Sequence, residues 1–496
     1  MATVAIAQHA SAQYSQDAIR FSGAQTGATS RIKALGNANV AVGGDLTSIG
    51  GNPAGLGFFT RSELSITPEF NMNKVGSDFL GQNSKSSRND ANLNNASVVF
   101  YSQVNKGPGE SKSTGWLSVN FGASYNRTNN FYQKTYYSGV NPTSSIADYY
   151  ATLGNIALDN NYSLNGYLEG WAQAQKLIYL NSSGNYEATT TLEGTQSNTV
   201  VSSGGQSDLN FSFGANYSNK LYIGAGFGLT SLRYNTTSNF VEDNFQYISV
   251  NKDFVSNYTR DQVTRGNGFN GRIGLIYKPV ETVRIGATLT TPTWYTIDDN
   301  SGEGLSTRYQ GGDNYRANDG YSSSYPSTYL LRTPLKVAGG IAVFAGKYGF
   351  ITGDIEYMDY SSTKLSNSSD NDNPIDFTQD NNDIKRLYKS AVNLRFGAEA
   401  RLVNSFFLRG GYGIQGSPFK DGAVLLDDTD GNKHYGKTTT VSGGLGYRFK
   451  DYYIDATYMH LSNNTKQYPY EYGDLSPDAK VNNRNNNVFL TVGLRF

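Results

Sequence analysis

The sequence predicts an all-β protein, a 14-stranded antiparallel transmembrane β-barrel with an N-terminal plug in its lumen. Three observations support this prediction. Many segments alternate between one apolar set of residues and one set of glycine, small polar residues and arginine. The connections between these segments are alternately short and long. A Gly- and Ala-rich stretch precedes the first segment and has too few apolar residues to form a core of its own.

The composition of the 496 residues excludes several classes of protein. Aromatic residues make up 13% of the chain, more than a disordered chain contains, and the 55 glycines argue against a helical protein. The formal net charge is zero, so the chain lacks the basic excess of nucleic-acid-binding proteins, and we expect no such partner. No cysteine is present, which excludes disulfides and thiolate metal sites. No apolar run approaches the roughly 20 residues of a membrane helix.

Residues 1–12 are typical of the end of an export signal. Ala10-Ser11-Ala12 fits the small-residue pattern at a cleavage site, and a polar segment follows it. The apolar run at 4–7 is too short for a complete signal core, and no basic region precedes it. We interpret residues 1–12 as a residual signal peptide; a frayed Ala-rich terminus is the alternative.

The last ten residues, NVFLTVGLRF, show the alternation that recurs along the chain. One alternating set is entirely apolar, whereas the other contains Phe489, Thr491, Gly493 and Arg495. Successive side chains of a strand point to opposite faces, so the apolar face must be buried against an apolar partner. A chain end is an unusual place for a protein core. We therefore expect the apolar set to contact lipid: Val488, Leu490, Val492, Leu494 and Phe496.

Fourteen segments are expected to be strands, each about as long as a tilted transmembrane strand. Outer-membrane barrels have an even number of antiparallel strands, short periplasmic turns and longer extracellular loops. We therefore expect the protein to lie in the bacterial outer membrane, in contact with its lipid. The segments are expected to begin near residues 61, 93, 114, 207, 221, 264, 282, 332, 349, 389, 405, 436, 452 and 487. The long loops are expected at 75–92, 130–206, 237–263, 295–331, 361–388, 415–435 and 464–486.

One long loop differs from the others because residues 144–181 contain helix formers. Leu168, Trp171 and Ile178 follow a helical period. We expect this part of the loop to be helical. The sequence leaves two interpretations open, a helix that caps the barrel mouth and an apolar landing surface for a ligand.

The chain divides into residues 13–58, the expected plug, and residues 59–496, the expected barrel with its long extracellular loops. The plug segment lacks a helix long enough to stand alone. A barrel of fourteen strands encloses a lumen wider than its own side chains can fill. The sequence therefore predicts that the N-terminal segment occupies this lumen.

The plug segment resembles that of the FadL/TodX-type outer-membrane transport proteins. The similarity consists of Phe21-Ser22-Gly23, a spaced Ala/Gly run from Ala34 to Ala41, and Asn52-Pro53-Ala54 directly before the first strand. The resemblance implies a plugged 14-stranded barrel that takes up long-chain fatty acids or aromatic hydrocarbons passively. It also implies a lumenal pocket near the plug N-terminus and a sideways exit through the wall. Proline stiffens the Asn52-Pro53-Ala54 corner, which is either a fixed corner or part of a moving gate.

The candidate ligand-binding residues follow from these expectations. Tyr14, Ile19 and Phe21 are placed to line an apolar pocket, and Phe58 and Phe59 end the plug. Leu168, Trp171 and Ile178 form the candidate landing surface. Three arginines on inward faces are expected either to hold a ligand carboxylate or to pair with lumenal acids and plug groups such as Asp45. They are Arg284, Arg395 and Arg448.

The resemblance leaves one alternative function open. A related branch of such barrels serves as a partner subunit in protein secretion, in which case the extracellular loops would contact a protein partner. We also expect the barrel-assembly machinery to recognise the C-terminal Phe496. We expect no enzyme activity, cofactor or metal site, because His460 has no evident nucleophile partner in the sequence. The acidic loop at 428–432 weakly resembles a calcium loop and is expected to be solvated instead.

Overall fold

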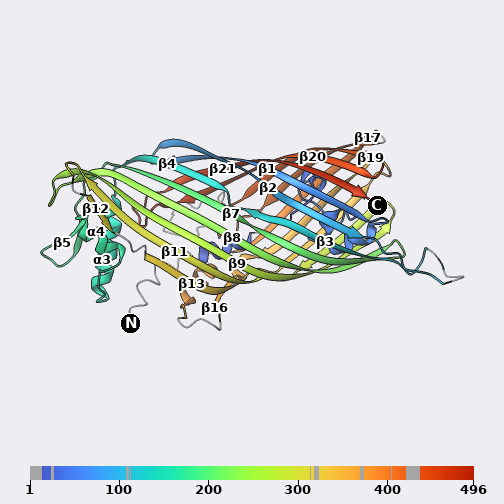
Figure 1. Ribbon diagram of the computed structural model, residues 1–496, viewed down its shortest axis with the longest axis horizontal. Coiled ribbons are helices and arrows are strands. Elements are labelled where there is room, and N and C mark those ends of the chain that lie inside the picture. The colour runs from blue at the N-terminus through green and yellow to red at the C-terminus, as the bar shows by residue number, and fades with distance from the viewer. Residues whose placement is uncertain are drawn as a thin grey trace.

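The computed structural model shows a closed antiparallel β-barrel that is extended at one end (Figure 1). The structure describes residues 14–23, 27–107, 111, 113–312, 314–317, 323–368, 374–403, 405–420 and 436–496. The expected signal remnant and the acidic loop at 428–432 lie outside the described residues. Within the described residues, no helix has the length and hydropathy to cross a membrane.

The described wall contains fourteen spans when strands that continue one another are counted once, which confirms the predicted barrel. Four spans consist of two strands each: β3 with β4, β10 with β11, β13 with β14, and β15 with β16. Pairing of β1 with β21 closes the barrel. The wall strands are β1 (Glu63–Phe79), β2 (Gln82–Phe100), β3 (Trp116–Asn130), β4 (Gln133–Asn141), β7 (Gly194–Tyr217), β8 (Leu221–Gln246), β9 (Lys252–Val280), β10 (Val283–Thr290), β11 (Trp294–Tyr309), β13 (Ser323–Arg332), β14 (Lys336–Phe344), β15 (Gly349–Asp359), β16 (Lys364–Asn367), β17 (Ser390–Val403), β18 (Phe406–Gln415), β19 (Thr438–Phe449), β20 (Tyr452–Gln467) and β21 (Ala479–Arg495). The short strand β12 (Asn314–Ala317) pairs with β11.

The outer face of the barrel carries the apolar residues. In β21, Val492 is exposed, whereas Phe489 and Thr491 on the other face are buried. Exposed apolar side chains also follow the neighbouring strands around the wall, for example Leu445 in β19, which is 60% exposed, and Phe213 in β7. A continuous apolar belt of this kind is stable only against hydrocarbon. The predicted lipid-facing side of the last strand is therefore confirmed, and the barrel spans a membrane.

Several strands extend well beyond the expected boundaries. Residues 75–92 and 237–263 were expected to be long loops, but the structure forms β1–β2 and β8–β9 ladders there, with turns near Leu80 and at 247–251. Parts of the expected loops at 130–206, 295–331 and 464–486 are also strands. Above the membrane both faces of a strand can be polar, so backbone pairing continues without the apolar alternation on which the prediction relied.

The wall ladder is interrupted between β2 and the span formed by β3 and β4. Residues 95–100 of β2 pair with residues 121–126 of β3. Among the described residues, the outer part of β2, residues 82–94, pairs with β1 alone, and β4 pairs with β7 alone. Phe131 lies at the break between β3 and β4. We call this interruption the β2–β4 gap.

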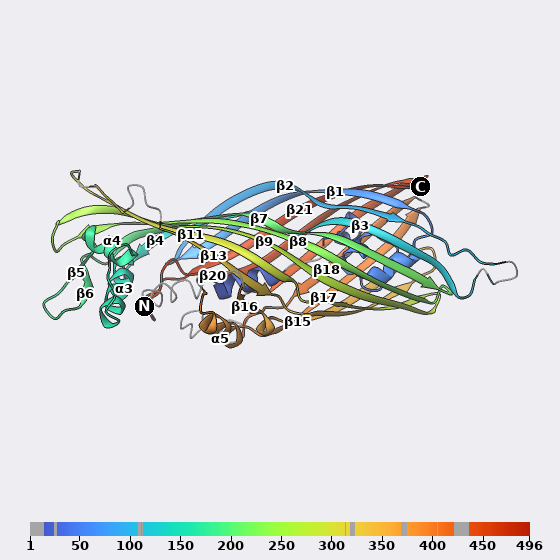
Figure 2. The same ribbon diagram turned by 60° about the horizontal axis from the view of Figure 1, so that its bottom comes forward.

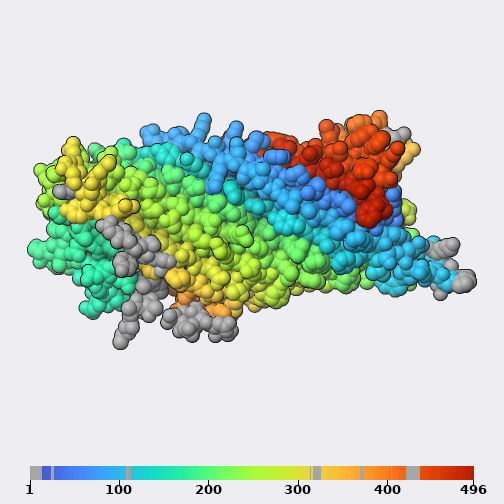
Figure 3. Space-filling model, viewed as in Figure 1, coloured from blue at the N-terminus to red at the C-terminus, as the bar shows by residue number. Residues whose placement is uncertain are grey.

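The N-terminal segment, residues 27–59, packs against the inner face of the wall. It contains α2 (Ser30–Ala34) and two 3-10 helices, η1 (Leu46–Ile49) and η2 (Pro53–Phe58). Wall strands cover most of this segment on the face that Figure 3 shows. Inward glycines allow its backbone to lie directly on the strands, because a Cβ at Gly286 would overlap Val40 and one at Gly411 would overlap Gly36. This close approach explains the glycine-rich inner face.

Two helices lie against the extended strands at the end of the barrel opposite the C-terminus (Figure 1). They are α3 (Ile146–Asp159) and α4 (Leu168–Ala174), and the hairpin of β5 (Ile178–Leu180) and β6 (Tyr186–Ala188) follows them. The carboxylate of buried Glu242 in β8 accepts hydrogen bonds from Ser145 Oγ at 2.7 Å and from Ile146 N at 2.8 Å. The wall strand therefore caps the N-terminus of α3 and fixes its position.

The helix α5 (Thr378–Leu387) lies on one side of the barrel, near β15 and β16 (Figure 2). It precedes β17, and the 3-10 helix η3 (Tyr360–Ser362) joins β15 to β16. Two of the wall interruptions contain proline, at Pro292 between β10 and β11 and at Pro334 between β13 and β14. Because proline has no backbone donor, each of these residues ends a strand where it occurs.

Candidate functional site

An apolar cluster fills the lumen above the N-terminal segment. Its centre is a short helix at residues 14–22, which contributes the sequence candidates Tyr14, Ile19 and Phe21. The Phe21 ring lies 6.0 Å from the Phe131 ring and 5.8 Å from the Tyr234 ring, measured between centroids. The cluster therefore reaches from the middle of the lumen to the β2–β4 gap. We call it the lumenal cluster.

The helix at 14–22 is held by polar contacts as well. Arg20 forms an ion pair with Asp17, and Gln262 Nε2 donates a hydrogen bond to Asp17 Oδ2 at 2.6 Å. Tyr14 Oη donates to Ser327 Oγ at 3.1 Å. Burial raises the pKa of the Asp17 carboxyl, and the ion pair with Arg20 partly offsets that effect. These contacts fix the helix in the lumen while its apolar side chains remain in the cluster.

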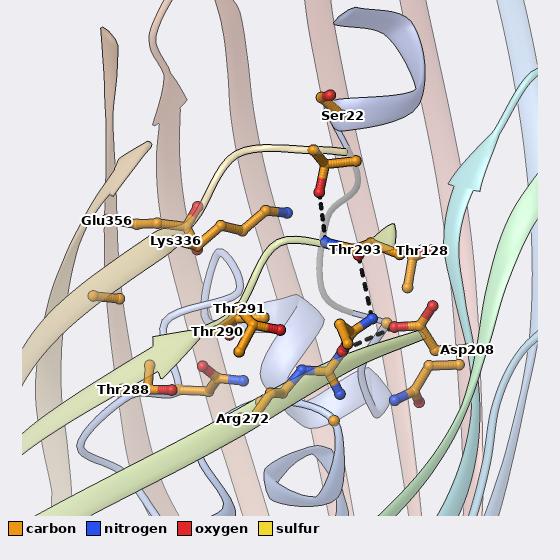
Figure 4. Close-up of a pocket in the computed structure, with 18 of the residues that line it drawn as sticks. Ser22, Thr128, Asp208, Arg272, Thr288, Thr290, Thr291, Thr293, Lys336 and Glu356 are labelled. Atoms are coloured by element: carbon orange, nitrogen blue, oxygen red, sulfur yellow. Dashed lines mark hydrogen bonds and ion pairs between the residues drawn. The ribbon is translucent and has the colours of Figure 1, made fainter. Parts of the chain in front are cut away.

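A polar cavity of about 80 Å³ is lined at one end by Phe21 and Ser22, and Figure 4 shows Ser22 above it. Its floor is the N-terminal segment, and its sides are wall strands. Threonines line much of it: Thr128, Thr288, Thr290, Thr291, Thr293 and Thr333. The two Thr-Pro breaks in the wall bring Thr293 and Thr333 together, and Thr293 N donates to Thr333 Oγ1 at 2.8 Å. We call this space the polar chamber.

The charged groups of the polar chamber include three cations and two carboxylates. Arg272 Nη2 lies 2.8 Å from Asp208 Oδ2, and Arg395 Nη2 lies 2.7 Å from Glu356 Oε1. Lys336 also lines the chamber, and Figure 4 shows it beside Glu356. The lining of the chamber therefore contains one more basic side chain than acidic side chains. Arg395 therefore pairs with a lumenal acid, which is one of the two alternatives predicted for the inward arginines, and it also lines the chamber.

A second charged cluster joins the N-terminal segment to the wall. Arg31 contacts Glu399 through two hydrogen bonds of 2.8 and 3.1 Å and lies 3.7 Å from Asp45. Arg409 Nε donates to Glu399 Oε2 at 2.6 Å, and Arg409 Nη1 donates to Asp455 Oδ1 at 2.6 Å. The candidate Arg448 also binds Asp455, at 3.0 Å. Arg448 therefore belongs to this anchoring cluster.

The third candidate arginine, Arg284, has a different environment. Its guanidinium lies over the rings of Phe58 and Phe344, 4.1 and 4.2 Å from their centroids, and donates to the carbonyl oxygen of Val42. Phe58 also stacks on Tyr222 with a centroid distance of 3.7 Å. These contacts hold the end of the N-terminal segment against the wall.

The remaining plug candidates have structural contacts of their own. Phe59 packs in a small buried cluster with Leu56 and Val99. The Asn52 side chain accepts from Ala54 N at 3.1 Å and donates to Val40 O at 2.7 Å. It therefore caps η2, which begins at Pro53, and ties it to the rest of the segment.

The candidates Leu168, Trp171 and Ile178 lie in a separate apolar cluster. This cluster joins α3 and α4 to inward aromatic residues of the extended strands, including Phe240 and Tyr258. Leu168 and Ile178 are buried in it, and Trp171 is partly buried. The structure therefore does not bring these residues together with Tyr14, Ile19 and Phe21.

Sequence reasoning did not single out the chamber threonines, Lys336 or Phe131. The Thr-Pro-Thr run at 291–293 and the Thr-Pro-Leu run at 333–335 were the available signal, because a proline inside a strand pattern marks a break. Outside the chamber, His460 Nδ1 lies 2.8 Å from Asn486 Oδ1. Within the described residues, no group of His, Cys, Asp and Glu is arranged to hold a metal ion.

Comparisons with known proteins concern the fold. No protein-family model and no curated protein sequence matches the chain. Among solved structures, the toluene transporter TodX of Pseudomonas putida matches with a TM-score of 0.52 and 14% identity, covering 95% of this chain and 99% of that chain. A FadL homologue of Pseudomonas aeruginosa matches with a TM-score of 0.53 and 12% identity, covering 95% and 98%. This chain therefore has the fold of the FadL/TodX-type outer-membrane barrels.

Proposed function

We propose that this protein is an outer-membrane channel for passive uptake of hydrophobic small molecules. The observation that carries the proposal is the lumenal cluster, which runs without interruption from the helix at 14–22 to Phe131 at the β2–β4 gap. A lipid-facing barrel with an apolar interior path suits a ligand that dissolves poorly in water. Similar folds in a toluene transporter and a FadL homologue support this assignment.

The polar chamber favours an amphipathic substrate over an unsubstituted hydrocarbon. Its cations outnumber its carboxylates, and its threonines offer hydroxyl groups below the apolar cluster. An acyl chain would lie among the rings of the lumenal cluster, and its carboxylate would face Lys336 and Arg395. Long-chain fatty acids are therefore the substrate class that we propose.

We propose the β2–β4 gap as the exit to the membrane. Side chains, and not a backbone ladder, close it: Asn130 Nδ2 donates to Asp90 Oδ2 at 3.1 Å, and Arg88 Nη1 donates to Ser202 O at 2.6 Å. Side-chain contacts can separate without breaking the barrel, whereas a strand ladder separates only at the cost of many backbone hydrogen bonds. Phe131 lies between this gap and the lumenal cluster and would move as a ligand leaves.

The N-terminal segment would act as a fixed plug in this scheme, with residues 13–58 closing the route toward the periplasm. Its ion pairs through Arg31 and its close contacts with inward glycines hold it to the wall. A ligand that leaves sideways does not require this segment to move. In this scheme the corner at Asn52-Pro53-Ala54 is rigid and does not move during transport.

Linking the two sides of the gap is expected to stop uptake. In the variant Asp90→Cys/Asn130→Cys, a disulfide would replace the contact between the two side chains and prevent the gap from opening. The oxidised variant should lose most of its uptake of a labelled long-chain fatty acid into proteoliposomes, and reduction should restore it. Uptake of labelled toluene, measured in parallel, distinguishes the two substrate classes.

A matched control is the variant Asn464→Cys/Asn482→Cys, because these side chains already touch at 2.6 Å within the continuous β20–β21 ladder. Its disulfide should leave uptake unchanged. Normal fatty-acid uptake by the oxidised Asp90/Asn130 variant would rule out the exit at the β2–β4 gap. Absence of uptake by the wild-type protein would rule out the transport function.

A further inference from the structure

A second interruption of the wall is covered by a helix. Among the described residues, β16 pairs with β13 alone, and the outermost pair between β15 and β17 joins Asp359 to Ser390. Beyond that pair, no ladder joins β16 to β17 in the described structure. The helix α5 lies on this side of the barrel (Figure 2). The wall here therefore consists of a helix where a barrel ordinarily has paired strands.

Two asparagine side chains join β16 to α5 and to the segment that leads into it. Asn381 of α5 accepts a hydrogen bond from Leu365 N and donates one to Leu365 O, each at 3.0 Å. Asn367 makes the reciprocal pair with Ile375 N and Ile375 O, each at 2.8 Å. The Asn381 amide therefore replaces the bonds that a neighbouring strand would make to Leu365, whereas the Asn367 side chain satisfies the backbone of Ile375. The edge is thus paired through side chains, which can detach without dismantling a ladder.

The inner face of α5 packs directly on the lumenal cluster. Ile384 and Leu387 are buried there, and Phe377 precedes the helix. The Phe377 ring lies 5.5 Å from the Tyr14 ring and 5.7 Å from the Tyr329 ring. Outward movement of α5 would therefore expose the apolar residues around the helix at 14–22.

The closed position of α5 contains one unfavourable group. Asp380 is 1% exposed, and its Oδ1 atom has no hydrogen-bond partner among the described residues. Burial raises the pKa of the Asp380 carboxyl to about 7. A buried carboxylate oxygen without a partner disfavours the packed position relative to one in which water reaches it. The apolar contacts of α5 therefore keep the helix in its packed position, although this position buries the Asp380 carboxylate unfavourably.

We propose that α5 is a movable wall panel through which hydrophobic ligands enter the lumen from the side of the barrel. This proposal rests on the proposed transport function. An apolar ligand that takes the place of Ile384 and Leu387 keeps the lumenal cluster covered, so the exchange costs little hydrophobic free energy. The panel and the β2–β4 gap adjoin the same cluster, through Phe377 and Phe131 respectively. A ligand would thus enter and leave sideways and pass neither α3 nor α4.

A disulfide at the C-terminal end of α5 tests this proposal. Tyr388 and Phe419 face each other in an antiparallel bridge whose hydrogen bonds are made by the flanking residues, through Lys389 N and Lys420 N. Such non-hydrogen-bonded pairs have Cα atoms about 4.5 Å apart, close enough for a disulfide. The chain has no native cysteine to interfere. The variant is Tyr388→Cys/Phe419→Cys, and the probe is a labelled long-chain fatty acid in proteoliposomes.

The oxidised Tyr388/Phe419 variant should lose most of its uptake, and the reduced form should recover it. The Asn464→Cys/Asn482→Cys variant again serves as the control that should not respond. Equal uptake by both redox forms, at the wild-type rate, would overturn the panel and leave the transport function intact. Absence of uptake by the wild type would overturn both.

A second variant tests the panel without a cross-link. Asp380→Leu replaces the buried carboxylate with an apolar group and should hold α5 closed more firmly, which would slow uptake. Gln379→Leu changes the adjacent, exposed position and should have no effect. Uptake by the Asp380→Leu variant that equals or exceeds the wild-type rate would contradict the proposal.

Discussion

Replacing Arg409 with methionine is expected to lower the free energy of unfolding by about 3–5 kcal/mol. Arg409 is 3% exposed and bridges Glu399 and Asp455, which are themselves buried. Without the guanidinium, two carboxylates lie close together in the lumen, and only Arg31 and Arg448 remain to balance them. Removing one partner of a buried ion pair costs far more than the pair contributes, because the remaining charge stays desolvated.

The measurement is the free energy of unfolding in detergent micelles, from denaturant titration followed by tyrosine and tryptophan fluorescence. The matched control is Arg61→Met, since Arg61 forms an exposed ion pair with Asp451 at 2.8 Å. Its effect should be about 0–1 kcal/mol. The triple variant Arg409→Met/Glu399→Gln/Asp455→Asn should recover much of the loss. An Arg409→Met variant as stable as Arg61→Met would show that the cluster does not anchor the N-terminal segment.

Adding a single methyl group at Gly411 is expected to displace the N-terminal segment and let ions through the lumen. A Cβ at this position would overlap the backbone nitrogen of Gly36 and the carbonyl carbon of Leu35. Backbone atoms at that distance cannot move aside as a flexible side chain can, so either the wall or the segment must shift. The N-terminal segment is not held by a continuous strand ladder, so it should shift before the wall does.

Planar-bilayer recordings of the Gly411→Ala variant should show ion conductance well above that of the wild type. The preceding residue supplies a close control, because a Cβ at Gly410 meets nothing within 4 Å and points to the outer side of the strand. Gly410→Ala should behave like the wild type. If both variants conduct alike, the N-terminal segment does not depend on this contact for its position.

The lipid-facing side of the barrel could be predicted from the sequence because its cause is local. Hydrocarbon accepts only apolar side chains, so every second residue of a membrane strand must be apolar, as in Val488, Leu490 and Val492. The outer ends of β1, β8 and β9 lack this constraint because water reaches both faces. Their strands were therefore missed, although their backbone pairing is as regular as in the membrane.

Some residues of the candidate site could likewise be predicted from the sequence, and others could not. Tyr14, Ile19 and Phe21 could be selected as apolar residues ahead of the barrel, and the structure places all three in the lumenal cluster. Their ligand contacts stay a prediction. Phe131, Lys336 and the chamber threonines join them only because distant strands converge, and no local pattern marks that convergence. The three candidate arginines looked alike in sequence, yet Arg395 lines the chamber, Arg448 belongs to the cluster that holds the N-terminal segment, and Arg284 lies between two aromatic rings.

The sequence by itself determined that this chain forms a lipid-facing barrel of fourteen spans with a glycine-lined interior. Each segment that contacts lipid must alternate between apolar and other residues, and the number of such segments gives the number of spans. Only the tertiary structure decided where the wall is incomplete, at the β2–β4 gap and beneath α5. A missing ladder is a relation between two segments that lie far apart along the chain. Neither segment carries a signal of it, since a backbone group satisfied by Asn381 and one satisfied by a neighbouring strand look the same in sequence.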